Sequence, residues 1–340
     1  MTALRVAFAG LAHSHPFTDA QNVLAQGGEV VAVHDADPAA AAGFAGRFDA
    51  VVAPSTEALA SYGADLVIAT PRWDETVPAL RGLTGADAAA PVFVNKTVAA
   101  TPAQVSAFAA AVADAHVAVG TSSVLRFAPA VVALAEAVAA DRAAGAEVLA
   151  VRVHAQHDAA AFRLPGREWQ DDPERGGGTL VTVGVHAWEM VDAVLPGAAL
   201  VAPSGSTRRI AGSATRSEDL GVVCGMLEVP GAAVTSRAAP PAVPASTAGR
   251  VASAVERIPV QVLVSGVPGP DAYRIEVVTA AGVRAADLDV DDANESLGFA
   301  GLVRALRAAA GDGRAAAPWS EAEVVVRNTV TAAMAAREGR

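Results

Sequence analysis

Residues 4–16 read Leu-Arg-Val-Ala-Phe-Ala-Gly-Leu-Ala-His-Ser-His-Pro and, with Glu-Val-Val-Ala-Val-His-Asp at 29–35, they decide the predicted fold class. The first run is apolar up to Gly10, as in a strand buried inside a parallel sheet. A helix is expected next, because Pro16 suits a first helical turn. The second strand ends at Asp35, 25 positions after Gly10. A strand, turn, helix and strand followed by an acid form the layout of a dinucleotide-binding unit.

The turn after the first strand departs from the glycine fingerprint of dinucleotide-binding proteins. Where that fingerprint has three glycines, this chain has Gly10, Ala12 and His15. Ala12 is a small change, whereas His15 either loosens the packing of helix on strand or points toward the ligand. His13 and His15 could bind a metal or donate to phosphate, but no third ligand lies nearby, so no metal is predicted. Asp35 is expected to hold a ribose hydroxyl, with the helix N-terminus facing the pyrophosphate.

Strand-like and helical segments continue to alternate through the first third of the chain. Further strands are expected at 50–53, 65–70, 92–94 and 117–120, with helices between them. This alternation predicts a doubly wound parallel sheet, which we assign to a first domain of residues 1–122. In such sheets ligands bind at the carboxyl ends of the strands. The predicted cofactor-binding residues are Gly10, Ala12, His13, His15, Asp35, Thr70, Pro71, Arg72 and Lys96.

The composition limits the classes of function. A length of 340 residues favours two domains, and a hydrophobic content of 52% favours a globular protein. The net charge of −11 and the aromatic content of 4% argue against nucleic acid and anionic membranes as partners. The single cysteine, Cys224, excludes an internal disulfide and a cysteine zinc site. Neither a transmembrane run nor a signal peptide is recognisable, so a cytoplasmic location is expected.

A second informative stretch is residues 176–189, Gly-Gly-Gly-Thr-Leu-Val-Thr-Val-Gly-Val-His-Ala-Trp-Glu. Three consecutive glycines cost backbone entropy, so a close approach of the backbone to another body is expected. The apolar residues that follow recur at helical spacing, which predicts one helix. Thr182, His186 and Glu189 share a face of that helix, as a buried polar network or as a site. We expect the glycines to let the helix begin close against the first domain.

The second half of the chain reads mainly as strands and forms a predicted α+β domain, residues 123–340. An open, antiparallel sheet is predicted from five strand-like runs, at 148–154, 221–227, 232–236, 260–265 and 273–279. Helices are expected near 299–311 and from a capping box at Ser320 onward, and this last helix can pack back on the first domain. His154 and His157 would lie on opposite faces of a strand, which argues against a shared metal.

Taken in order, these segments resemble the glucose–fructose oxidoreductase/inositol dehydrogenase family, often written Gfo/Idh/MocA. The resemblance covers almost the whole chain, and the order and spacing of its pieces make it specific. The pieces are the strand before Gly10, the strand end at Asp35, Ile-Ala-Thr-Pro at 68–71, Asn-Lys-Thr at 95–97 in place of Glu-Lys-Pro, Arg-Phe-Ala-Pro at 126–129, and 176–189 in place of G-G-G-x-L-x-D-x-G-x-H-x-x-D.

The resemblance implies that the first domain binds NAD or NADP and that the second holds the substrate and makes the oligomer contact. By position, Lys96 is the active-site lysine and His186 the catalytic acid/base, with Thr182 where the family has an aspartate. A partly desolvated lysine has a lowered pKa and can act in proton transfer. Asp35 favours NAD over NADP, because no arginine follows the second strand to hold a 2′-phosphate. The predicted substrate-binding residues are Arg126, His157, Trp169 and Glu189.

The leading interpretation is an NAD-dependent oxidoreductase for a sugar, a cyclitol or a related polyol. It would form a homodimer or homotetramer through the second sheet. Thr182 cannot carry charge or tune the histidine as an aspartate would, and this leaves two alternatives open. One is non-redox use of bound NAD in elimination or glycoside cleavage. The other is a catalytically silent cofactor-binding partner or sensor protein.

Overall fold

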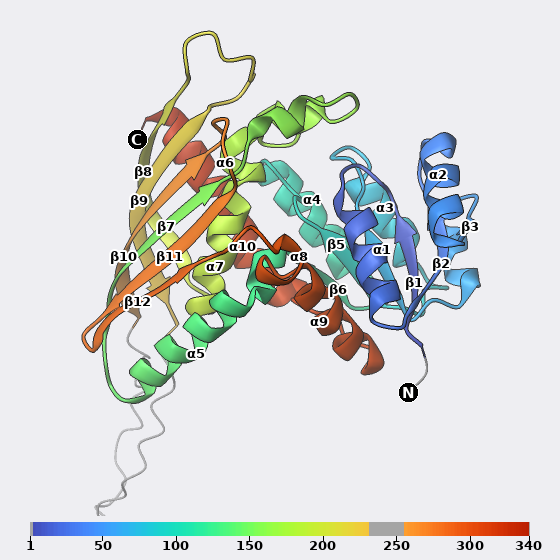
Figure 1. Ribbon diagram of the computed structural model, residues 1–340, viewed down its shortest axis with the longest axis horizontal. Coiled ribbons are helices and arrows are strands. Elements are labelled where there is room, and N and C mark those ends of the chain that lie inside the picture. Colours follow the sequence, from blue (N-terminus) through green and yellow to red (C-terminus); the bar gives the residue numbers. More distant parts are fainter. Residues whose placement is uncertain (1–2, 231–254, 340) are drawn as a thin grey trace, which may run out of the picture.

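The structure is a computed structural model that describes residues 3–230 and 255–339. Two sheets dominate its two halves, and helices fill the space between them (Figure 1). The predicted parallel sheet of the first half is confirmed, and so is the mostly antiparallel sheet of the second half. The predicted strand at 232–236 lies outside the described residues.

The first sheet is wholly parallel, with the strand order β3-β2-β1-β4-β5-β6. Its strands are β1 (Arg5–Ala9), β2 (Glu29–His34), β3 (Val51–Val52), β4 (Leu66–Ala69), β5 (Val92–Asn95) and β6 (Val119–Ser122). β4 and β5 are buried throughout, which explains why they are apolar except for Asn95 at the end of β5. Because β2 lies on one side of β1 and β4 on the other, a crevice opens at the carboxyl ends of these strands.

Helices flank this sheet (Figure 1), and the first turn of two of them is capped by a side chain. They are α1 (His15–Ala25), α2 (Pro38–Phe48), α3 (Thr76–Leu83) and α4 (Pro102–Ala113), with the short 3₁₀ helix η1 (Glu57–Tyr62). Asp37 Oδ1 accepts a hydrogen bond from Ala39 N at 2.8 Å at the start of α2. Thr101 and Gln104 form a capping box at the start of α4.

The second sheet has the order β12-β11-β7-β10-β9-β8, in which only the central pair, β7 and β10, is parallel. Its strands are β7 (Val148–Gln156), β8 (Ala199–Arg208), β9 (Leu220–Val229), β10 (Glu256–Ser265), β11 (Ala272–Thr279) and β12 (Gly282–Asp287). One face packs on helices, while the other is open and exposes Leu149 and Val283. The alternating burial along β10 and β11 follows from this one-sided packing.

The remaining helices lie between the sheets or beside them (Figure 1). They are η2 (Val124–Phe127), α5 (Pro129–Ala143), η3 (Ala159–Arg163), η4 (Glu168–Asp171), α6 (Gly178–Thr182), α7 (Gly184–Val194), α8 (Ala293–Ser296), α9 (Phe299–Gly311) and α10 (Trp319–Glu338). The Trp319 ring lies 4.9 Å from that of Phe108 in α4, so the last helix begins against the first sheet's helices. In the described part of the chain no helix is long and apolar enough to cross a membrane.

Two predictions about helix starts were wrong. The single helix expected after the glycines is two helices, α6 and α7, which meet at Val183. A β-branched residue followed by Gly184 has low helix propensity, and this explains the break. The capping box expected at Ser320 does not form, because α10 already begins at Trp319, after Pro318.

Candidate active site

The turn after β1 brings the ends of three strands together. Gly10 has a φ of +80°, and a Cβ at this position would lie 2.7 Å from the carbonyl oxygen of Thr70. Gly10 N donates to His34 O at 2.8 Å, and Ala12 N donates to Thr70 O at 3.0 Å. Glycine is therefore required at this one position of the altered fingerprint, because any side chain would strike the end of β4.

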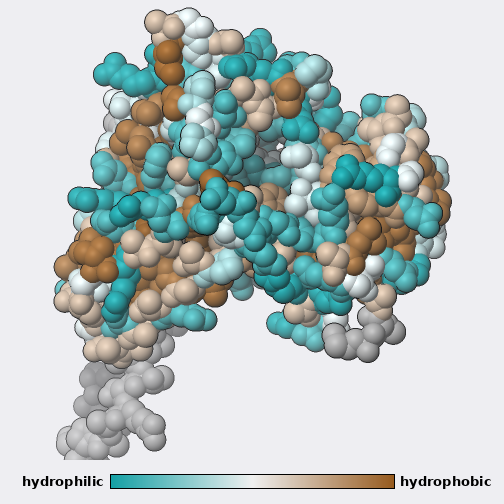
Figure 2. All heavy atoms as spheres, viewed as in Figure 1, coloured by the Kyte–Doolittle hydropathy of each residue, from teal (hydrophilic) through white to brown (hydrophobic). Residues whose placement is uncertain are grey.

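Asp35 fixes this turn from the end of β2. Its two carboxylate oxygens accept hydrogen bonds from Leu11 N at 2.6 Å and from Asp37 N at 2.8 Å. A cavity of about 240 Å³ lies on one side of Asp35, between η1 and α3. A groove of about 490 Å³, which also includes Asp35, continues toward the second half of the molecule. Figure 2 shows a recess between the two halves with hydrophilic residues along its border.

Among the other predicted cofactor residues, Pro71 lines the cavity, while Ala12 and Arg72 line the groove. Arg72 Nε lies 3.7 Å from Asp74 Oδ1, so part of its charge is already compensated. Thr70 is buried behind the turn, where its Oγ1 accepts a hydrogen bond from Asn95 Nδ2 at 2.9 Å. The structure thus brings these residues to one edge of the first sheet, whereas their binding of a cofactor stays a prediction.

His13 and His15 lie beside each other at the start of α1, with ring centroids 4.5 Å apart. His13 Nε2 lies 3.2 Å from Lys96 O, and His13 Nδ1 accepts from His15 N at 3.2 Å. Burial and the charge of Lys96 lower the pKa of His13 to about 3, so this ring is neutral. His15 packs edge-on against Phe299 at 5.2 Å. In residues 3–230 and 255–339, no group of three His, Cys, Asp or Glu side chains could hold a metal ion.

Lys96 follows β5 and reaches toward the second half of the molecule. Its Nζ lies 3.5 Å from Thr182 O, at the end of α6. Burial lowers the pKa of Lys96 to about 8, although the Asp271 carboxylate opposes this shift. An amine that is charged near neutral pH but loses its proton just above it is suited to proton transfer.

His186 lies in α7 and is buried, with 7% of its surface exposed. Its Nδ1 lies 2.5 Å from Ser123 Oγ, which leaves Nε2 without a partner among the described residues. Burial and the charge of Lys96 lower the pKa of His186 well below its usual value, so the ring is neutral at pH 7. The Tyr273 ring stands edge-on to it at 5.4 Å. The arrangement fixes the imidazole while one nitrogen stays available.

Thr182 contacts Lys96 through its backbone carbonyl and not through its side chain. Its Oγ1 donates to Gly176 O at 3.2 Å, so the hydroxyl ties α6 to the glycine turn. The carbonyl oxygen of Thr182 is what faces Lys96 Nζ. The proposed chemical role of this side chain stays a prediction, but the hydroxyl has a structural partner.

The three glycines are required by contacts within the second half of the chain, which corrects the expectation that they face the first domain. A Cβ on Gly176 would lie 2.4 Å from Gln170 Cα, and one on Gly177 would lie 2.3 Å from Val181 Cβ. A Cβ on Gly178 would lie 2.4 Å from Ser217 Cβ. The turn is therefore packed against η4, α6 and the loop before β9.

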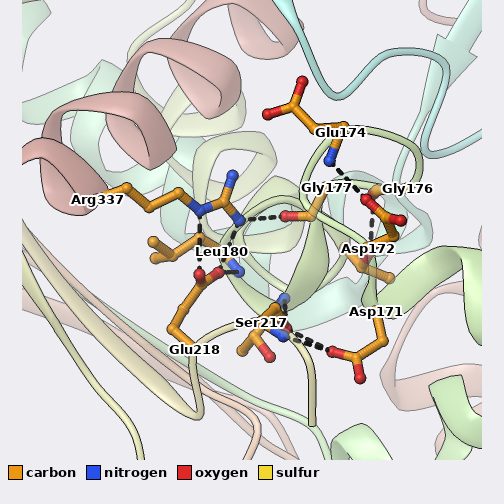
Figure 3. A network of polar contacts seen from close by, with 11 residues as sticks. Asp171, Asp172, Glu174, Gly176, Gly177, Leu180, Ser217, Glu218 and Arg337 are labelled. Atoms are coloured by element: carbon orange, nitrogen blue, oxygen red, sulfur yellow. Dashed lines mark hydrogen bonds and ion pairs between the residues drawn. The ribbon is translucent and has the colours of Figure 1, made fainter.

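A network of buried and partly buried charges holds this turn in place (Figure 3). Glu218 accepts hydrogen bonds from Leu180 N at 2.9 Å and from Arg337 at 2.8 and 3.0 Å. Arg337 also donates to Gly177 O at 2.5 Å. Asp171 accepts from Ser217 Oγ at 2.6 Å. Since these groups satisfy one another, the start of α6 has a fixed position relative to Lys96.

Two predicted substrate residues, Arg126 and Glu189, form an ion pair in which Arg126 Nε lies 2.8 Å from Glu189 Oε2. Arg126 pairs with Asp192 as well, and Glu189 Oε1 accepts from Ser123 N at 3.1 Å. Trp169 is buried beside the glycine turn. Contact of any of these residues with a substrate stays a prediction.

His157 lies just after β7, and its Nδ1 is 2.8 Å from Asp271 Oδ1. His157 and Lys96 are both close enough to His186 to be among the causes that lower its pKa. The pair formed by His157 and Asp271 therefore lies near Lys96 and His186.

Sequence reasoning missed three residues of this site, Ser123, Asp271 and Tyr273. Ser123 directly follows β6, so the rule that ligands bind at the carboxyl ends of strands could have found it. Asp271 and Tyr273 reach the site only because β11 pairs with β7, with Tyr273 opposite Ala155. No local pattern signals that pairing.

The fold is that of known sugar and cyclitol oxidoreductases. No protein-family model and no curated protein matches the sequence. Among solved structures, GenD2 from gentamicin A biosynthesis, in complex with NAD, superposes with a TM-score of 0.77 at 22% identity, over 100% of this chain and 96% of that chain. A myo-inositol dehydrogenase from Corynebacterium glutamicum gives 0.74 at 15% identity, over 100% and 98%. An Agrobacterium radiobacter oxidoreductase, in complex with NAD+, L-tartaric acid and magnesium, gives 0.68 at 15%, over 100% and 98%.

Proposed function

We propose that this chain is an NAD-dependent oxidoreductase of the Gfo/Idh/MocA family that acts on a carbinol carbon of a sugar, a cyclitol or a related polyol. One observation carries the proposal: a groove lies beside Asp35 at the carboxyl edge of the parallel sheet, and Lys96, which follows β5 at the same edge, is close enough to the buried His186 to lower its pKa. The solved neighbours have the same fold, and two of them are NAD complexes. This supports the family resemblance that the sequence motifs indicate.

The residues at the sheet edge fit a dinucleotide. The cavity beside Asp35 is lined by Ala36, Pro71 and Pro78, which suit a flat, apolar base, and Asp35 suits a ribose hydroxyl. A 2′-phosphate at the same place would meet the carboxylates of Asp35 and Asp37, so NAD is favoured over NADP. Bound NAD would supply the hydride acceptor, and the chain supplies positioning and proton transfer.

His186 and Lys96 divide the proton transfer. With Nδ1–H donating to Ser123 Oγ, His186 keeps its Nε2 lone pair free to take the substrate's hydroxyl proton. Lys96 in its charged form polarises the substrate oxygen. His157, Trp169, Arg126 and Glu189 remain the candidates for substrate selection. The alternative of non-redox NAD chemistry uses the same groups and would differ by producing no net NADH.

Titration calorimetry with NAD and NADH tests the proposal directly. We expect saturable binding of both, with NADP binding at least about tenfold more weakly, because of repulsion at Asp35 and Asp37. A panel that includes myo-inositol, sugars and nucleotide sugars should then contain a compound that yields NADH. If the protein binds neither nicotinamide cofactor, the proposed oxidoreductase activity is wrong.

The pH dependence of the reverse reaction is expected to follow Lys96. In ketone reduction the charged amine is the active form, because it polarises the oxygen on which negative charge develops, while His186 returns the proton that it takes in oxidation. With the pKa of Lys96 lowered to about 8, kcat/KM for reduction should be maximal below that pH and fall above it. In a Lys96→Arg variant the guanidinium stays charged. Its kcat/KM for reduction should therefore show no fall above pH 8, whatever its absolute rate. A wild-type profile that is flat between pH 6.5 and 9.5 would contradict the assignment.

We also propose that the open face of the second sheet forms the contact of a homodimer or homotetramer. This face exposes Leu149 and includes a shallow hollow of about 400 Å³ near Arg152 and His154. An unpaired sheet face with exposed apolar side chains is typical of an interaction surface. Light scattering should give two or four times the monomer mass of 34.0 kDa.

A further inference from the structure

The second half of the chain contributes its own side of the cofactor groove. The groove beside Asp35 is lined by Leu11, Ala12 and Asp37 on one side, and by Pro165, Gly166 and Arg167 on the other. These last three residues belong to the turn between η3 and η4, in the half that carries the second sheet. A ligand in this groove would therefore touch both halves of the molecule.

Arg167 differs from the other basic residue of the groove. Arg72 lies 3.7 Å from Asp74, whereas within the described ranges the Arg167 side chain has neither a hydrogen bond nor an ion pair. It is only partly exposed, and it is close enough to His13 for its charge to help lower the pKa of that ring. A half-buried guanidinium without a counter-charge is unusual, because desolvation of a charge costs free energy unless it is paired.

The support of Arg167 is rigid. Arg167 N donates to Leu164 O at 2.9 Å, and Gln170 N donates back to Arg167 O at 2.9 Å. Two residues further on, Trp169 is buried, and Asp171 is held by Arg216 N at 2.7 Å. The guanidinium is therefore presented from a fixed turn and needs little ordering to bind an anion.

We infer that Arg167 binds the pyrophosphate of the dinucleotide from the second domain, across the groove from the turn after β1. This inference rests on the proposed function. The charges that line the groove orient the ligand. Its four carboxylates, Asp35, Asp37, Asp74 and Glu75, repel phosphate, whereas Arg167, which is close enough to His13 to lower its pKa, attracts phosphate toward the turn after β1. The turn after β1 keeps only one of the three fingerprint glycines, so its backbone amides are less accessible to a pyrophosphate. A cation from the second domain would compensate for these weaker contacts.

The test compares three ligands by titration calorimetry. NAD and ADP-ribose contain the pyrophosphate, and adenosine does not. Arg167→Ala is expected to weaken NAD and ADP-ribose by about tenfold and to leave adenosine unchanged. The difference should shrink between 50 and 500 mM salt, because the interaction is ionic. Arg167→Lys should recover part of the loss, since it keeps the charge but not the fork of donors.

Arg163→Ala is the matched control, because Arg163 lies on the same segment, is exposed and does not line the groove. Circular dichroism should show that both alanine variants are folded, because neither side chain has a hydrogen bond or an ion pair among the described residues. If the wild type and Arg167→Ala bind NAD with equal affinity, the inference is wrong but the proposed function stands. The same holds if Arg167→Ala loses as much affinity for adenosine as for NAD. A wild type that binds no NAD would overturn the proposed function, and the inference with it.

Discussion

Replacing His186 with alanine is expected to lower kcat for polyol oxidation by about 10²–10⁴-fold, the usual contribution of a positioned acid/base. Among the described residues His186 Nε2 has no hydrogen-bond partner, while Ser123 holds Nδ1 and Lys96 is close enough to lower the pKa of the ring. Affinity for NAD should stay within about twofold, because the predicted dinucleotide residues lie at the edge of the first sheet. The measurement is steady-state NADH formation together with NAD titration of the same preparation.

His116→Ala is the control for this variant. His116 is exposed and lines neither the cavity nor the groove beside Asp35. Its replacement should leave kcat unchanged. If His186→Ala turns over substrate at the wild-type rate, proton transfer belongs to another group, and the pair formed by His157 and Asp271 becomes the first candidate.

Ser123 is a positioning residue for the same step. Ser123→Ala removes the partner of His186 Nδ1 and the cap that accepts from Leu125 N at 3.2 Å. We expect a smaller loss of kcat than for His186→Ala, with recovery in Ser123→Thr, which keeps the hydroxyl. A purely structural role would lower the melting temperature without changing the pH profile of kcat/KM, and this separates the two explanations.

The first sheet could be predicted from the sequence because each of its strands is a local signal. A short apolar run between a helix end and a turn is visible without knowledge of its neighbours, and caps such as Asp37 and Thr101 mark the helix starts. The carboxyl-end rule then placed Gly10, Asp35 and Lys96 at one edge. This reasoning needs only the chirality of parallel connections, not the contacts between side chains.

The contacts that complete the site are not local, and the sequence does not contain them in readable form. Ser123 meets His186 across 63 positions, and His157 meets Asp271 across 114. The first contact depends on how α7 packs against η2, and the second depends on how β11 pairs with β7. The sequence also does not predict the direction of the Thr182 side chain. Its hydroxyl donates to Gly176 O, and only its carbonyl oxygen faces Lys96. The glycines at 176–178 signalled a close approach correctly, but the partners were η4, α6 and the loop at Ser217.

Asp19→Asn is expected to stabilise the folded chain by up to about 4 kcal/mol at pH 8 and to have little effect near pH 4. Asp19 is completely buried in α1, where Asn95 Nδ2 donates to its Oδ2 at 3.0 Å. Burial raises the pKa of this carboxyl from 3.8 to about 7, although the hydrogen bond from Asn95 opposes the shift. Below pH 4 both the folded and the unfolded chain hold this proton. Between pH 4 and 7 only the folded chain does, so stability falls as pH rises and the loss is complete above pH 7.

An asparagine at this position removes the titration and suits the surroundings. In the described part of the chain, Asp19 Oδ1 and Asn95 Oδ1 are buried atoms without a hydrogen-bond partner. The amide introduced by the substitution would bring N–H donors to a place where Asn95 Oδ1 lacks one, while its own oxygen could still accept from Asn95 Nδ2. Urea unfolding at pH 4, 6 and 8 should give a difference from wild type that grows with pH, whereas Asp87→Asn, at an exposed position, should give none. A difference that is constant across this range would show that Asp19 is ionised in the folded protein throughout, and that the carboxylate is stabilised by its surroundings.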